Sequence, residues 1–104
     1  MDTQLKRGLL EACVLASLTK ADSYGYQIVK DVPPTLALTE STLYPILKRL
    51  ESGGLLSVYS IEYSSRLRKY YRLTDAGRRK VDEFIDEWQD MMEVYEYIRK
   101  EAAR

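Results

Sequence analysis

The sequence of 104 residues contains no histidine and only one cysteine. The absence of histidine removes the commonest general base and the commonest metal ligand of proteins. A single cysteine can form neither an intramolecular disulfide nor a zinc site, and the sequence has no glycine-rich phosphate-binding loop. The carboxylates of segment 82–93 fall on the polar face of a helix, as solvated surfaces do. We therefore expect no enzyme, no cofactor and no metal.

Long hydrophobic runs are also missing. No apolar stretch approaches the roughly 18 residues that a membrane-spanning helix requires, and the N-terminal segment lacks the layout of a signal peptide. We therefore expect a cytoplasmic protein with no membrane partner. Cys13 lies in the apolar segment 9–16, where a buried small hydrophobic residue is a better interpretation than a reactive thiol.

The net charge is zero, but the charges are divided unevenly along the chain. Residues 1–81 carry 13 Lys and Arg against 8 Asp and Glu, a net charge of +5. Residues 82–104 carry 3 against 8, a net charge of −5. A basic body with an acidic tail points to a polyanionic partner for the body, because the charge of a segment bears on its partners more than the total does.

Periodicity and turn signals predict three helices, a hairpin and a longer fourth helix. The expected helices cover 4–18, Tyr24–Asp31, Thr42–Glu51 and Asp75 to about Arg99. The expected strands cover Leu55–Glu62 and Leu67–Thr74, with a turn at Tyr63–Arg66. This order is that of a winged helix-turn-helix, a mainly α (α+β) fold whose third helix enters the major groove and whose hairpin is the wing. We expect residues 1–74 to form the DNA-binding domain and residues 75–104 a dimerisation helix of the same compact unit.

Polar residues at the helix starts predict the caps. We expect Asp22 or Ser23 to cap the second helix, Ser41 the third and Thr74 the fourth. With Ser41 as the cap, Pro45 takes the fourth helical position, where its missing N–H costs only one early hydrogen bond.

The third helix has an apolar stripe and a polar face. The stripe comprises Leu43, Ile46, Leu47 and Leu50. The exposed set, expected to meet phosphates or base edges, comprises Ser41, Thr42, Tyr44, Lys48 and Arg49. Capping or solvation is an alternative explanation for each hydroxyl or charged residue of this set. Tyr44 is harder to explain in that way, because it is a large ring at an exposed helix start.

Four basic residues lie within seven positions of the second strand. Interleaved with Tyr70 and Tyr71, they comprise Arg66, Arg68, Lys69 and Arg72. Alternation places Arg66, Arg68, Tyr70 and Arg72 on one face of the hairpin. Basic side chains beside tyrosine hydroxyls suit phosphate contacts, which position a protein on DNA. The alternative is an edge strand protected from pairing by its charges, but a position directly after a helix-turn-helix favours DNA.

Apolar residues recur every three or four positions along the last helix, a spacing typical of a helix that packs along a partner. This seam comprises Val81, Phe84, Ile85, Trp88, Met91, Met92, Tyr95, Ile98 and Ala102. We expect a homodimer in which the first helix assists the seam. The expected interface residues are Leu9, Val81, Ile85, Trp88, Met92, Tyr95 and Ile98.

Three stretches of the sequence resemble the PadR family of regulators. Residues 40–56 contain the pattern Thr-Leu-Tyr-Pro followed by Arg-Leu-Glu-x-x-Gly-Leu. Residues 68–77 match the family's wing strand and its exit into the last helix, and residues 23–28 resemble the opening of its second helix. The resemblance implies a homodimeric repressor of adjacent genes that a small molecule or another signal releases from DNA. A two-fold symmetric dimer is expected to bind duplex DNA at an inverted repeat.

The resemblance also implies roles for individual residues. DNA contacts are assigned in this way to Tyr24, Thr42, Tyr44, Pro45, Arg68, Lys69 and Tyr70. Trp88 resembles the tryptophan that stacks planar aromatic compounds between subunits in multidrug-sensing relatives, and Met91 and Met92 would add adaptable walls to a site for a small aromatic effector. The alternative is that Trp88 is plain interface core. The wing segment 64–68 lacks the glycines common in the family, so we expect a stiffer or differently shaped tip.

A second hypothesis is a winged-helix protein-interaction module that dimerises without binding DNA. Such an adaptor has no reason to collect positive charge on the half that carries the third helix and the wing, with negative charge on the tail. The division of charge therefore favours the DNA-binding repressor.

Overall fold

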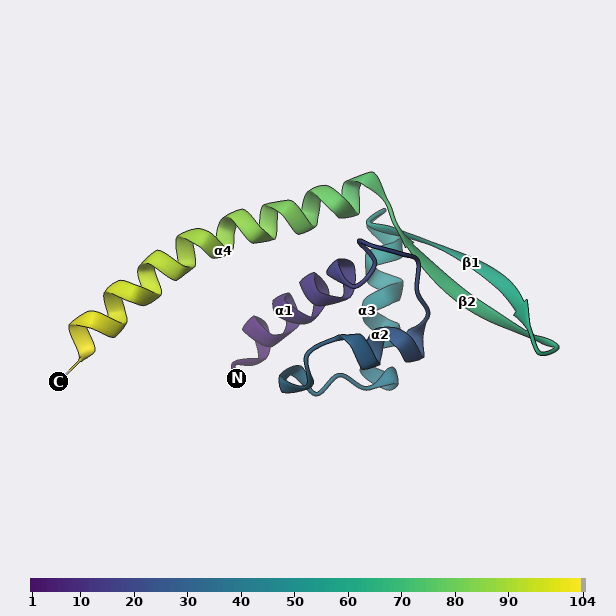
Figure 1. The fold of residues 1–104 in the computed structure, drawn as a ribbon, viewed down its shortest axis with the longest axis horizontal. Helices are drawn as coiled ribbons and strands as arrows, with labels where there is room; N and C mark the ends of the chain where they lie inside the picture. Colours follow the sequence, from purple (N-terminus) through teal and green to yellow (C-terminus); the bar gives the residue numbers. More distant parts are fainter. Residues whose placement is uncertain (104) are drawn as a thin grey trace.

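A computed structural model describes residues 1–103 of the chain, so that Arg104, part of the expected last segment, lies outside the described residues. In chain order the elements are α1 (Thr3–Ala16), α2 (Gly25–Asp31), a short 3₁₀ helix η1 (Pro34–Leu36), α3 (Glu40–Ser52), β1 (Leu56–Tyr63), β2 (Arg66–Leu73) and α4 (Asp75–Ala102). The two strands form one antiparallel sheet (Figure 1). This order confirms the predicted winged helix-turn-helix fold with a long C-terminal helix.

The core lies where α1, α2 and α3 meet the base of the hairpin and the start of α4. The predicted stripe of α3 is buried throughout. From the other elements the core takes Val14 and Leu15 of α1, Ile28 of α2 and Val81 of α4, all buried. Cys13 is half-buried and packs against this core, and burial raises the pKa of its thiol. The cysteine therefore packs against the core as a small hydrophobic residue, although it is half-buried rather than buried as expected.

The cap of α3 differs from the prediction. The helix begins at Glu40, and the hydroxyl of Thr39 accepts a hydrogen bond from the backbone N–H of Thr42 at 3.3 Å. The prediction that Ser41 is the cap is therefore wrong, because Thr39, the first of three hydroxyl-bearing residues within four positions, takes that role. Pro45 accordingly occupies the sixth helical position rather than the fourth. Its missing N–H leaves the carbonyl of Ser41 without the usual helical hydrogen bond.

The cap of α2 also differs from the prediction. The helix begins after Tyr24, whose side chain makes no capping hydrogen bond. Neither Asp22 nor Ser23 caps it, because both are engaged by the wing: Asp22 through its carboxylate, and Ser23 through a backbone bridge to Tyr71. The cap of α4 agrees with the prediction, since the hydroxyl of Thr74 accepts a hydrogen bond from the backbone N–H of Gly77 at 3.1 Å.

The wing is a regular hairpin with a two-residue turn. Its register pairs Leu56 with Leu73 at the base and Tyr63 with Arg66 at the tip. The turn residues Ser64 and Ser65 both have positive φ, 48° and 65°. Two consecutive positive φ values characterise the turn whose twist matches that of paired strands, usually built with Asn-Gly. The tip thus has the required shape without glycine, at the cost of two serines in the left-handed region.

Helix α4 extends far beyond the body of the protein. Its first half packs along α1, while its C-terminal part projects past the other elements of the described chain (Figure 1). The molecule consequently measures 61 × 26 × 21 Å. The apolar residues of α4 are spaced by charged ones, and within residues 1–103 no helix has the length and apolar character needed to cross a membrane.

Candidate nucleic-acid interface

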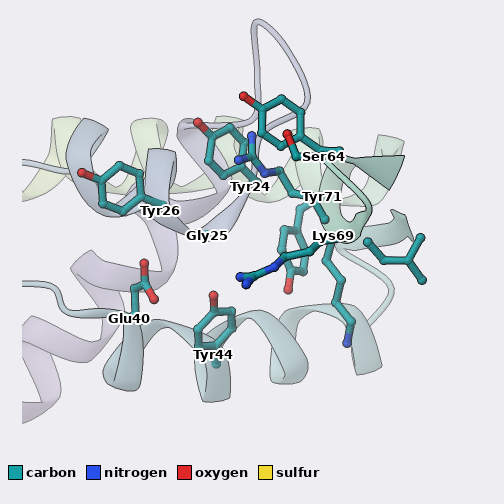
Figure 2. A pocket seen from close by; sticks show the side chains of 12 residues that line it. Tyr24, Gly25, Tyr26, Glu40, Tyr44, Ser64, Lys69 and Tyr71 are labelled. Carbon is teal, nitrogen blue, oxygen red and sulfur yellow. The ribbon is translucent and has the colours of Figure 1, made fainter. Parts of the chain in front are cut away.

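A groove of about 840 Å³ separates the wing from the helix-turn-helix. Its walls come from the start of α2, the start of α3 and the outer half of the wing (Figure 2). The lining residues are Tyr24, Gly25, Tyr26, Glu40, Tyr44, Tyr63, Ser64, Arg66, Leu67, Arg68, Lys69 and Tyr71. Five of the expected DNA-contacting residues are in this set, so the fold brings together candidates that lie up to 45 positions apart in the sequence.

Tyr44 stands in this groove. It rises from α3 toward the start of α2 (Figure 2) and is 48% exposed. A Cβ atom placed on Gly25 would come within 2.8 Å of the Tyr44 hydroxyl oxygen, so the absence of a side chain at Gly25 makes room for this ring. The ring therefore has a defined position, with a hydroxyl that can donate to and accept from a ligand in the groove.

The other candidates of α3 divide into two groups. Ser41, Thr42, Pro45 and Lys48 are exposed, as expected. Arg49 is turned toward α1, where its guanidinium donates to the Glu11 carboxylate at 2.8 Å. The structure therefore ties Arg49 to α1 rather than to the groove, and its contact with DNA stays a prediction.

On the wing, Arg68 is held between aromatic rings. Its guanidinium lies 4.2 Å from the ring centroid of Tyr24 and 4.2 Å from that of Tyr63, a favourable arrangement for a cation over a π-face. Tyr70 packs against the edge of Tyr24 at 5.5 Å and stacks on Tyr59 at 5.7 Å. Hydrogen bonding to Tyr70 is the main cause that raises the pKa of Arg68. Arg68, Tyr70 and Tyr24 thus form one packed cluster.

Arg66 and Lys69 lie differently from Arg68. Both line the groove and are exposed. Neither takes part in a salt bridge within residues 1–103, and the same holds for Lys48 on α3. Three positive charges with no internal ion pair therefore border the groove or the adjoining face of α3, and can meet an external anion without breaking a salt bridge.

Sequence reasoning missed a cluster at the base of the wing. The carboxylate of Asp22 accepts hydrogen bonds from the Tyr59 hydroxyl at 2.6 Å and from Arg72 at 3.1 Å. The hydrogen bond from Tyr59 and then Arg72 lower the pKa of Asp22, and the same contacts raise the pKa of both partners. Asp22 and Arg72 are 50 positions apart, so no local pattern could have paired them. Tyr26 and Glu40 were also missed, because the groove that they line is formed by segments distant in the sequence.

Some of the expected interface residues of α4 are buried in the protomer, and the others are exposed. Val81 belongs to the core of the protomer and is only 9% exposed, so it has little surface left for a partner. The exposed apolar residues of the seam are Ile85, Met91, Met92, Tyr95 and Ile98. Leu9 of α1 packs partly against the core. The seam that remains available therefore begins at Ile85.

Trp88 is half-buried between α4 and α1. Its ring stacks on Phe84, with centroids 5.8 Å apart and ring planes inclined by 17°. Together with Met91 it lines a hollow of about 150 Å³ against the first two turns of α1. The residues that complete the hollow are Gln4, Leu5, Gly8, Leu9, Phe84 and Glu87. Met92 does not line it, so the structure joins only two of the three expected ligand residues.

Comparison with known proteins identifies this architecture. The model of the transcriptional regulator PadR-like family matches residues 14–83, more than half of the chain. The chain belongs to the PadR-like family. A protein of Lysinibacillus sphaericus is 31% identical over 93 residues, which cover 85% of both chains. The crystal structure of smu.1704 from Streptococcus mutans is 41% identical, covers 91% of this chain and 90% of that one, and superimposes with a TM-score of 0.79.

Bacillus subtilis PadR offers a more distant comparison. It was solved in complex with operator DNA, and it is 27% identical to this chain with a TM-score of 0.65. The match covers 73% of this chain but only 47% of that one. PadR-like proteins are transcription regulators rather than enzymes, in agreement with the expectation from sequence.

Proposed function

We propose that this PadR-like regulator is a repressor that binds duplex DNA as a homodimer, with α3 in the major groove and the wing on the adjacent backbone. One observation carries the proposal: Tyr44 of α3 faces the same groove as Arg66 and Lys69 of the wing. Phosphate contacts from the two basic side chains would fix the position on DNA, while Tyr44 would meet base edges. The complex of Bacillus subtilis PadR with operator DNA supports duplex DNA as the partner.

Assembly through α4 would supply the two-fold symmetry that an inverted repeat requires. The seam from Ile85 to Ile98 is exposed in the protomer, and water-exposed apolar surface of this extent favours burial against another copy. Two third helices about one helical turn of DNA apart, roughly 34 Å, would meet half-sites spaced by about 10 base pairs or a multiple of that spacing.

The test begins with genomic DNA fragments that the purified protein retains, because these identify the operator. Affinity for the recovered duplex is expected to fall steeply with salt, since each neutralised phosphate releases counterions. Lys69→Gln removes one phosphate contact from each protomer and should lower the slope of log affinity against log salt by about 0.9 per protomer, about 1.8 for the dimer. The matched control, Lys100→Gln, makes the same charge change at the far end of α4 and should leave the slope unchanged. Tyr44→Ala should instead reduce the ratio of the affinity for the operator to the affinity for a duplex of random sequence.

Two outcomes would overturn this proposal. Retention of no duplex at all would support the alternative, a winged-helix module that binds another protein. Affinity that is the same in dilute and physiological salt would contradict phosphate contacts by the wing and α3.

The hollow beside Trp88 supports a proposal for the releasing signal. A planar aromatic effector could contact the indole ring where two copies of the seam meet, and Asp86, Glu87 and Asp90 nearby would favour a cation over an anion. We expect 1-naphthylmethylammonium to quench Trp88 emission and to weaken DNA binding, and the anion 1-naphthylacetate to do neither. Trp88→Ala should lose the response yet remain a DNA-binding dimer. If Trp88→Ala instead becomes monomeric and neither compound binds the parent protein, Trp88 is interface core.

A further inference from the structure

The link between α1 and α2 is attached to the base of the wing at three consecutive residues. The carboxylate of Asp22 accepts hydrogen bonds from Tyr59 on β1 and Arg72 on β2, at 2.6 and 3.1 Å. Ser23 and Tyr71 exchange two backbone hydrogen bonds of 3.1 and 2.7 Å. The ring of Tyr24 then contacts both Tyr70 and Arg68. The link therefore runs beside β2 like a short third strand.

Tyr24 contacts the wing as far out as the Ile61–Arg68 pair, and beyond that pair the described residues give the wing no comparable support. Its outer residues, including Ile61, Tyr63 and Leu67, are exposed, and an isolated two-stranded hairpin is marginally stable in water. The direction in which the hairpin leaves the body is consequently set at its base. Arg66 and Lys69, two of the three basic residues that line the groove, lie on the tip side of the Tyr59–Tyr70 pair, so their positions depend on the direction of the hairpin.

The cluster of Asp22, Tyr59 and Arg72 is poorly placed to stabilise the fold. The Arg72 side chain is 62% exposed, and an ion pair at such a site contributes little to the free energy of unfolding because water screens it. Its geometry is nevertheless well defined, since one carboxylate oxygen joins both strands at once. A contact that adds little stability but links two strands to the helix-turn-helix acts chiefly on orientation.

We propose that Asp22 is a positioning residue for DNA binding: through Tyr59 and Arg72 it holds the wing at the angle that brings Arg66 and Lys69 to the phosphates. Arg72 serves this support and contacts no phosphate itself. The inference rests on the proposed function, because it concerns the same DNA surface. It divides the basic residues of the wing into supporting and contacting ones, a division that their spacing in the sequence does not reveal.

Asp22→Asn tests the proposal, because loss of a negative charge and loss of positioning change the affinity for DNA in opposite directions. Removing a negative charge from a DNA-binding surface should by itself strengthen binding, because it reduces repulsion of phosphates. Loss of positioning should weaken it: if the wing holds the competent angle in about a tenth of the molecules, the affinity falls about tenfold. Glu101→Gln removes one negative charge at the exposed far end of α4 and serves as the control. The melting temperature of the Asp22→Asn protein should stay within about 3 °C of the parent's.

Arg72 distinguishes support from direct contact. If Arg72 contacts a phosphate, Arg72→Gln would lower the slope of log affinity against log salt by about 0.9 per protomer, about 1.8 for the dimer. If Arg72 only supports the wing, the slope stays unchanged while the affinity falls. In a double-mutant cycle, Asp22→Asn combined with Arg72→Gln should bind no more weakly than either single variant, because both act through one contact. Tyr59→Phe, which removes only the hydroxyl, should lower affinity in the same direction. The Arg66→Gln protein should show the lower slope.

These experiments distinguish failure of the positioning role from failure of the proposed DNA binding. Unchanged or stronger binding by Asp22→Asn, an Arg72→Gln protein with a lower slope, or additive effects in the cycle would overturn the positioning role while leaving DNA binding intact. Failure of the parent protein to retain any duplex would instead overturn the proposed function. If Asp22→Asn melts far below the parent, the role is structural and the proposal is wrong.

Discussion

Gly77→Ala is expected to destabilise the protein by about 3 kcal/mol or more, a large part of the roughly 5–15 kcal/mol by which a domain of this size is stable. Gly77 is buried in the first turn of α4, where a Cβ atom would overlap the backbone carbonyl oxygen of Leu55 and come within 2.6 Å of the Leu73 side chain. The carbonyl cannot turn away freely, because it accepts a hydrogen bond from the N–H of Thr74. The α4 helix would have to leave the base of the wing.

Gly53→Ala is the matched control. A Cβ atom at Gly53 would lie 3.6 Å from the nearest backbone atom, the carbonyl oxygen of Arg49, which is an ordinary contact distance. Its φ of −81° is accessible to alanine, so the free energy of unfolding should change by less than about 0.5 kcal/mol. Urea unfolding followed by circular dichroism measures both variants. A Gly77→Ala protein as stable as the Gly53→Ala protein would show that the junction of the wing and α4 is looser than described.

Tyr95→Glu is expected to weaken the proposed dimer about 100-fold or more, and with it binding to the operator. Tyr95 lies on the seam of α4 and is 54% exposed in the protomer. Losing its burial in two copies costs about 1 kcal/mol each, and burying a carboxylate from each copy in the interface adds a desolvation cost. A total of about 3 kcal/mol corresponds to roughly a hundredfold change in the dissociation constant. Operator affinity should follow, because linkage of two half-site readers raises their effective concentration.

Tyr97→Glu separates the interface from the general effect of charge. Tyr97 is also exposed, at 66%, and lies two residues farther on α4, about 200° around the helix. The same substitution there should leave the dimer intact. Analytical ultracentrifugation over a range of protein concentrations measures both proteins. Equal sedimentation of the two variants as dimers would mean that the seam is not the interface.

The sequence predicted the elements and their order because each had a local signal. The apolar stripe of α3 and the hydroxyl of Thr74 are examples, and both are as expected in the structure. Local signals failed where several neighbouring residues were each able to cap the helix. Thr39, Ser41 and Thr42 all carry a hydroxyl near the start of α3, and only the path of the preceding loop selects Thr39 as the cap.

The arrangement of the site was less predictable, since it depends on contacts between distant segments. The wing arginines were identified by their spacing, but the sequence did not reveal that Arg68 lies between Tyr24 and Tyr63 or that Arg72 is paired with Asp22. Similarly, the heptad pattern assigned Val81 to the seam together with Tyr95. The pattern is continuous, but the body of the protein covers its first part and leaves the rest exposed.

The projecting end of α4 links folding to protein concentration. The C-terminal part of the helix projects away from the other elements (Figure 1), and between Glu93 and Ala102 every residue except Glu96 is exposed. An isolated helix of this length is marginal in water. The ion pair between Arg99 and Glu96, at 2.9 Å, adds only a few tenths of a kcal/mol. In the proposed dimer this segment gains its helical order when the partner arrives. Its ordering and the assembly of the dimer are then a single bimolecular equilibrium, whereas the winged helix-turn-helix body folds unimolecularly.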